Sequence, residues 1–168
     1  MRFVILAALL VALTTATVGG ARADSSGPPW GPATPNFNLQ VVLRPVAGGA
    51  GTGFGLVAFR QPISDGQQIV YLDTWVRDLA PNASYQLQRA VDTNLNGACS
   101  GTSWLTLGRG TTAQAIATDD RGTGRELLWR DLSALPLGAQ FDIHFRVIDA
   151  VSMAVVLESS CYQFTVSQ

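Results

Sequence analysis

The chain has 168 residues, of which 47% are hydrophobic and 14% charged, and its formal net charge is −1 at pH 7. This length and composition are typical of a single globular domain. It contains no lysine, and its eleven arginines are scattered singly among acidic residues. Such scattering does not create the basic surface that neutralises phosphates, so the sequence predicts no nucleic-acid partner.

The first residues are typical of a secretory signal. Arg2 precedes an apolar run over residues 3–13, and Ala21-Arg22-Ala23 has the small-x-small form of a cleavage site. An uncleaved membrane anchor is the weaker alternative, because a membrane span needs about 20 apolar residues. We therefore predict a signal peptide over residues 1–23 and a secreted, extracellular protein without a membrane attachment after cleavage.

Residues 24–36 hold four of the eight prolines and little that could pack, which indicates a flexible Pro/Gly/Ser-rich leader. One domain is then expected over residues 37–168. In an oxidising compartment its two cysteines, Cys99 and Cys161, are expected to form a disulfide. Two free buried thiols are the alternative, whereas catalytic use is disfavoured because neither a C-x-x-C pair nor a neighbouring histidine is present.

From residue 37 onward, apolar and polar residues alternate in short runs separated by turn sequences, a pattern that predicts β-strands. Arg89 interrupts the inward side of one run, so we expect the end of that strand to leave the core. The pattern predicts an all-β, antiparallel β-sandwich of about eight or nine strands, in which the last two runs are divided by residues 158–160, a candidate β-bulge. The runs are residues 37–44, 54–60, 67–76, 84–91, 104–107, 111–118, 126–132, 140–149, 153–157 and 162–166.

One corner between two of these runs carries a family resemblance. Its sequence is Leu79-Ala-Pro81-Asn-Ala-Ser-Tyr85, and it resembles the tyrosine corner of fibronectin type III and related immunoglobulin-like modules. The resemblance implies an immunoglobulin-like sandwich in which Tyr85 caps the turn and its ring enters the core. The chain departs from that family because about 80 residues follow the corner instead of two strands. The chain also resembles secreted bacterial proteins of unknown function, which supplies no mechanism.

A looser copy of the same stretch occurs later in the chain. Trp75 to Val91 and Trp129 to Val147 each place a tryptophan, Arg-Asp-Leu and a proline turn before an aromatic residue that starts an alternating run. Two related strand–turn–strand halves would explain the length of the domain. Chance similarity among β-turn sequences is the alternative, and the sequence alone does not decide between them.

A polar loop follows the second of these runs. Asp92, Asn94 and Asn96 precede Gly97 with the spacing of the first half of a calcium loop. The position of the bidentate glutamate is occupied by Ser103, so an Asn/Gly-rich connection between strands is the better interpretation. Carbohydrate binding, with Trp104 stacking on a sugar, is a further alternative.

Catalytic motifs are weak throughout the chain. His144 is the only histidine, it alternates with polar residues on the expected outward face, and no G-x-S-x-G elbow occurs. A hydrolase built from converging carboxylates is therefore the least favoured interpretation, and we expect neither an enzyme nor a cofactor. Asn82 begins a glycosylation sequon, although the turn itself explains an asparagine there.

These observations predict a secreted, non-catalytic binding or structural module. The expected partner is a protein or glycan, contacted by the loops at residues 92–102 and 47–53, and the chain is expected to be monomeric. A calcium- or carbohydrate-binding domain is the alternative.

Overall fold

We describe residues 37–47, 52–62 and 67–167 of a computed structural model, and in this part of the chain the structure is all-β. The predicted fold class is therefore confirmed at the level of secondary structure. Twelve strands are present among the described residues: β1 Phe37–Pro45, β2 Phe54–Gln61, β3 Ile69–Arg77, β4 Ser84–Asp92, β5 Leu105–Thr106, β6 Gly108–Arg109, β7 Thr112–Ala113, β8 Ile116–Ala117, β9 Gly124–Asp131, β10 Gln140–Asp149, β11 Val155–Ser159 and β12 Tyr162–Thr165.

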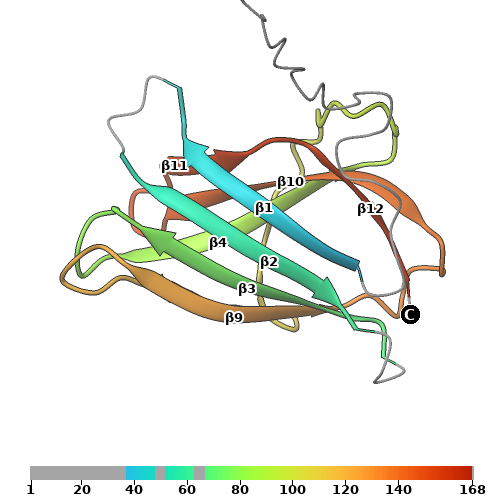
Figure 1. Ribbon diagram of the computed structural model, residues 1–168, viewed down its shortest axis with the longest axis horizontal. Helices are drawn as coiled ribbons and strands as arrows, with labels where there is room; N and C mark the ends of the chain where they lie inside the picture. The colour runs from blue at the N-terminus through green and yellow to red at the C-terminus, as the bar shows by residue number, and fades with distance from the viewer. Residues whose placement is uncertain (1–36, 48–51, 63–66, 168) are drawn as a thin grey trace, which may run out of the picture.

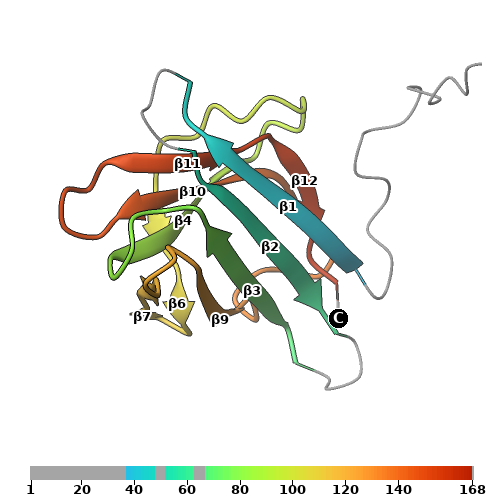
Figure 2. The ribbon, with the colours of Figure 1, turned by 60° about the vertical axis from the view of Figure 1, so that its left-hand side comes forward.

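The long strands form one antiparallel path that curls around a common interior (Figures 1 and 2). Its order is β4-β10-β11-β1-β2-β3-β9, and the short segment with β5 and β6 lies between the two ends. β5 pairs with β4, whereas Arg109 of β6 pairs with Trp129 of β9 in parallel. This mixed sheet is thereby nearly closed into a barrel. We call the bridging segment, residues 105–110, the seam.

The predicted immunoglobulin-like sandwich is not confirmed, and the strand count differs from the expected eight or nine. Residues 104–107 and 111–118 were expected to form two strands, but this region contains the four two-residue strands β5 to β8. These strands are short because turns interrupt them, as at Gly110, whose φ is 67°. Only glycine adopts such a backbone conformation without a steric cost.

Side chains bridge a gap between β1 and β12, which do not pair through their backbones. β10 pairs with β12 over its first half and with β11 over its second half, and β11 alone reaches β1. Opposite β12, the Val42 amide donates to the Tyr162 hydroxyl at 3.2 Å. Gln61, buried at the end of β2, bonds to both the amide and the carbonyl of Ser167. These contacts substitute for backbone pairing.

The core occupies the inside of the barrel, because alternate residues of every long strand point inward. β3 gives the pattern clearly: Val70, Leu72, Thr74 and Val76 are buried, and the residues between them are partly exposed. Phe59 of β2 contacts Phe145 and Phe164 edge-on, with ring centroids 6.2 and 4.8 Å apart. Aromatic side chains thus fill the middle of one end of the barrel.

The two similar stretches of sequence form counterpart elements. The first supplies the end of β3 and most of β4, and the second supplies the end of β9 and most of β10. β3 pairs with β9, and β4 pairs with β10, so each half lies against its counterpart. This arrangement describes how the halves pack; the common origin of the two halves stays a prediction.

Some predictions concern segments outside the described residues. The signal peptide over residues 1–23, the leader over residues 24–36 and most of the loop at residues 47–53 belong to this group. Among the residues that are described, no helix has the length and apolarity needed to cross a membrane.

Candidate functional site

The polar loop predicted as the working surface is a folded cover on the outside of the barrel. We call residues 93–104, between β4 and β5, the outer loop. The Trp104 ring lies 4.5 Å from the His144 ring, and the Arg146 guanidinium lies 4.0 Å from the Trp104 centroid. Trp104 therefore packs on β10, and this contact explains it without a sugar.

His144 was expected to be solvated, and the structure corrects this prediction. The residue does point outward from the sheet, but the outer loop covers it and leaves it half-buried. Its Nε2 lies 3.1 Å from the Gly101 carbonyl oxygen, which can only accept a hydrogen bond. This contact requires a proton on Nε2 and makes His144 part of the support for the loop.

The three candidate calcium ligands bond mostly to the loop itself. Asp92 accepts hydrogen bonds from the Asn94 amide at 3.1 Å and from the hydroxyl of Ser100, and Asn96 accepts one from the Ala98 amide at 2.8 Å. These are Asx turns, which satisfy backbone donors within a tight loop. The hydroxyl of Ser100, followed by the Asn94 amide, lowers the pKa of Asp92. The side-chain oxygens of Asp92 and Asn96 thus already have partners.

A buried carboxylate lies beneath this loop. Asp142, expected on the outward face of β10, has 0% of its surface exposed because the loop covers it. Its Oδ2 accepts hydrogen bonds from the Asn96 and Gly97 amides at 3.0 and 2.8 Å, and its Oδ1 has no partner among the described residues. Asp142 is an anchor for the outer loop that the alternating pattern did not reveal.

The predicted disulfide is confirmed. Cys99 of the outer loop is bonded to Cys161, which lies between β11 and β12, with 62 residues of sequence separation. The bond fixes the outer loop to the neighbouring strand connection. Together with Asp142, it makes the predicted binding loop a constrained structural element.

The corner residues have an ordered arrangement of their own. Tyr85 is buried, and its hydroxyl accepts a hydrogen bond from the Ala80 amide at 3.1 Å. Leu79 packs against the core, whereas Pro81 is exposed in the turn. The local contacts fit a capped turn, and the family resemblance itself stays a prediction.

A cavity of about 210 Å³ lies inside the barrel, at the end where β4 and β9 terminate and β10 begins. We call it the inner cavity. Its walls are mainly apolar core side chains, and Leu135 and Thr93, both exposed, place it next to the surface. The apolar side chains that form its floor and sides include Val70, Leu72, Ile143, Phe145 and Phe164.

Two arginines line this otherwise apolar cavity. Arg89 was expected to mark the point where β4 leaves the core, but β4 continues inward at Val91 and both residues line the cavity. Arg130 of β9 does the same, and its Nη1 donates to the Gly110 carbonyl at 3.1 Å. Arg89 has no hydrogen-bond or ion-pair partner among the described residues. Burial, and then the charge of Arg130, lowers the pKa of Arg89.

The sequence contained a signal for these two residues. Arg89 lies between the inward residues Leu87 and Val91, and Arg130 lies between Leu128 and Leu132. When the residues two positions before and two positions after an arginine both point inward, the arginine also points inward, because side chains alternate along a strand. The strand was instead taken to leave the core, and Arg130 was interpreted only as part of the repeat.

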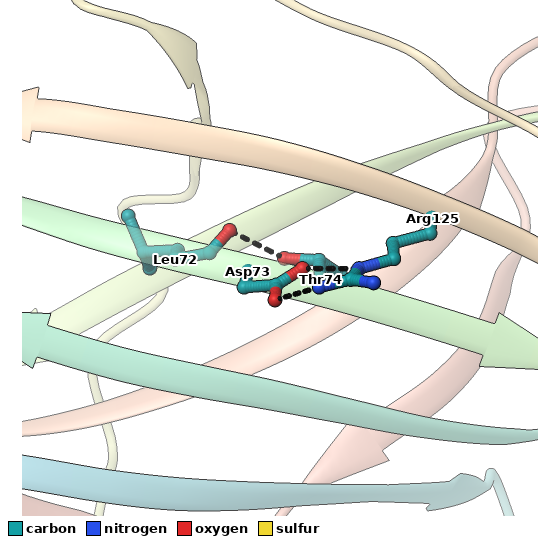
Figure 3. Close-up of polar contacts among 4 residues, drawn as sticks. All are labelled: Leu72, Asp73, Thr74 and Arg125. Atoms are coloured by element: carbon teal, nitrogen blue, oxygen red, sulfur yellow. Dashed lines mark hydrogen bonds and ion pairs between the residues drawn. The ribbon is translucent and has the colours of Figure 1, made fainter.

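The outer face of β2, β3 and β9 carries a second depression, an open groove of about 710 Å³. Its lining includes Arg60, Tyr71, Asp73 and Leu127. Figure 3 shows the fork between Asp73 and Arg125, with Nε–Oδ1 and Nη2–Oδ2 distances of 2.8 and 2.5 Å. The hydrogen bond from Arg125 is the main cause that lowers the pKa of Asp73.

Comparison with known proteins supplies no activity for this geometry. No family model, no curated protein and no solved structure matches the chain. Among the residues that the structure describes, no group of three or more histidine, cysteine or acidic side chains is placed to hold a metal ion. Any function has to be argued from the inner cavity, the outer loop and the outer groove themselves.

Proposed function

We propose that this protein is a secreted, non-catalytic binding module that takes a small ligand into the inner cavity. The observation that carries the proposal is a cavity of about 210 Å³ in the middle of aromatic core residues, lined by an arginine without a partner. Interiors are normally packed to a density that leaves few voids larger than a water molecule. A concave, mostly apolar space with a few polar groups is the usual form of a small-molecule site.

The internal bonding of the outer loop and the unfilled volume of the inner cavity support this choice over the loop-based alternative. The outer loop is tied down by the Cys99–Cys161 disulfide and by the Asp142 carboxylate, and the oxygens of Asp92 and Asn96 accept hydrogen bonds from its own donors. The inner cavity, by contrast, combines unfilled volume with donors of Arg89 that have no partner among the described residues.

The predicted absence of catalysis remains a prediction. Secretion is supported by the signal-like N-terminal sequence, and the disulfide is compatible with it.

The proposal is tested with uncharged apolar compounds, which need only the cavity. Benzene and 1-octanol should raise the melting temperature of the protein in a dose-dependent way, because a ligand that binds only the folded state stabilises it. Ile143→Phe, which places a ring in the cavity, should abolish this shift. Val57→Ile, at a buried position that does not line the cavity, is the control and should keep it. If neither of these compounds nor octanoate changes the melting temperature of the wild type, the proposed function is wrong.

Carbohydrate binding is a second candidate, favoured by the outer groove. There an aromatic ring, Tyr71, lies beside the polar groups of Arg60 and Asp73, and a sugar presents both an apolar face and hydroxyls to such a surface. Retardation of the protein by neutral polysaccharides in native electrophoresis, lost in Tyr71→Ala, would support it. Unchanged mobility across a panel of polysaccharides would exclude it. The relation of this fold to immunoglobulin-like sandwiches is a separate proposal, which neither binding test addresses.

A further inference from the structure

The Arg89 side chain is the least satisfied charge near the inner cavity. A guanidinium keeps its proton at any physiological pH, so Arg89 cannot escape its surroundings by becoming neutral. It is half-buried on an inward position of β4, between Leu87 and Val91, and has no partner among the described residues. Its nitrogen atoms still reach solvent, although the residue is half-buried among apolar side chains. An anion at this position would give the guanidinium a charged partner in place of water.

A second guanidinium reinforces the positive character of the site. Arg130 enters the same cavity from β9, and within the described part of the chain its guanidinium donates only to the Gly110 carbonyl. Neither an aspartate nor a glutamate is present among the residues that line the cavity. The lining thus supplies no negative charge to the two arginines, and a bound anion would provide one. Guanidinium groups match carboxylates in particular, because two parallel N–H donors meet two oxygens.

The remainder of the cavity determines the chemical character and the size of the rest of the ligand. Beyond the arginines and Thr93 at the surface, its walls are aliphatic and aromatic, and they include Val70, Leu72, Phe145 and Phe164. Its volume of about 210 Å³ is below that of sites for drug-sized molecules, which hold about 300–1,000 Å³. A water molecule occupies about 30 Å³ in the liquid, and a methylene group is of similar size, so the cavity accepts roughly seven carbons.

We infer that the inner cavity binds a medium-chain carboxylate of about eight carbons, with its carboxylate between Arg89 and Arg130 and its hydrocarbon chain among the core aromatic side chains. This inference rests on the proposed function and adds the chemical class of the ligand. It makes the cavity selective for the charge of the headgroup and for the length of the chain.

Calorimetric titration of the full chain without its signal segment tests the headgroup. Octanoate should bind, 1-octanol should bind at least about tenfold more weakly because the charge-assisted hydrogen bonds are lost, and octylamine should not bind, because its charge repels the arginines. Affinity should rise by about fourfold per methylene from butanoate to octanoate, as expected for burial of each group. It should rise no further at dodecanoate, whose chain exceeds the cavity.

Matched variants locate the interaction. Arg89→Met should weaken octanoate binding by at least about tenfold and leave 1-octanol binding unchanged, and Arg130→Met should act in the same direction. Arg60→Met removes an arginine from the outward face of β2 and is the control, with unchanged octanoate binding. Arg89→Gln serves the same purpose if the methionine variant fails to fold.

The outcomes separate the two proposals. If 1-octanol binds as tightly as octanoate, or if Arg89→Met and Arg89→Gln both keep full octanoate affinity, the carboxylate inference is wrong and the binding function stands. If neither octanoate nor 1-octanol nor benzene binds, the proposed function fails together with the inference.

Discussion

The two faces of β10 show the contrast on which the functional argument depends. On the outer face, Asp142, His144 and Arg146 all have partners in the chain, two of them from the outer loop. On the inner face, Phe141, Ile143 and Phe145 border a cavity in which Arg89 has none. A polar loop is easily taken for a binding surface. The inner face combines unfilled volume with a charge at its wall, whereas the unpaired Oδ1 of Asp142 on the outer face is covered by the loop.

The largest effect is expected from removing the disulfide. The variant Cys99→Ser/Cys161→Ser should lower the free energy of unfolding by about 4 kcal/mol, since the bond closes a long loop in the unfolded chain. Urea unfolding followed by tryptophan fluorescence measures the change. Octanoate affinity should remain, because the bond lies on the outer side of the sheet. Loss of octanoate binding in a folded variant would show that the outer loop belongs to the binding site.

Asp142 should contribute the next largest effect. Asp142→Ala leaves the Asn96 and Gly97 amides without their acceptor under the loop, and we expect a loss of about 2 kcal/mol of stability. Asp142→Asn keeps one acceptor oxygen and should lose less. Equilibrium urea unfolding and limited proteolysis of the outer loop measure the result. Equal stability of all three proteins would mean that solvent replaces the carboxylate and that the loop is held by the disulfide alone.

Arg89 should give an effect of opposite sign. In the absence of ligand, Arg89→Met should raise the free energy of unfolding by about 1 kcal/mol, because an unpaired, half-buried charge is replaced by an apolar side chain of similar length. A residue kept at a cost to stability is typical of a functional site. Thermal unfolding without octanoate measures the gain in stability, and unfolding with octanoate measures the stabilisation lost when the ligand no longer binds. A destabilised ligand-free variant would instead assign Arg89 a structural role.

Acid pH should destabilise both the outer loop and the outer groove, each through one carboxylate. The pKa of Asp92 is lowered by the Ser100 hydroxyl, and the pKa of Asp73 is lowered by Arg125. A carboxylate with a lowered folded-state pKa contributes stability above its unfolded value of about 3.9, and this stability is lost as the pH falls through the folded value. Stability should therefore fall below about pH 4, and less steeply in Asp92→Asn. An unchanged slope in this variant would show that Asp92 is not held by the loop.

Much of the fold could be predicted from the sequence. Alternating residues located the long strands closely, because burial on one face imposes a period of two on the sequence. The seam could not be found in this way, since two-residue strands are too short to show a period. The curvature that brings β9 back to β4 could not be predicted either, because pairing partners are set by the packing of the whole sheet.

The candidate site was predictable in part. The pairing of Cys99 with Cys161 followed from the predicted oxidising compartment and from the presence of just two cysteines. Asp142 was missed because the alternating pattern places it outward without showing that a loop returns to cover it. Arg89 was noticed, but its inward parity was interpreted as the end of the core. Whether an inward charge is tolerated depends on space inside the barrel, which the sequence does not state.

The seam has a consequence for how the interior communicates with solvent. β5 and β6 have two residues each, whereas the neighbouring β3–β9 pair continues over eight registered positions. Amide protons at Leu107 and Gly110 should therefore exchange with deuterium sooner than those of β3, because short contacts open locally at a lower free energy. Leu107 also lines the inner cavity. The shortest strand pairings of the barrel thus lie beside its interior, and local opening there leaves the longer strands paired.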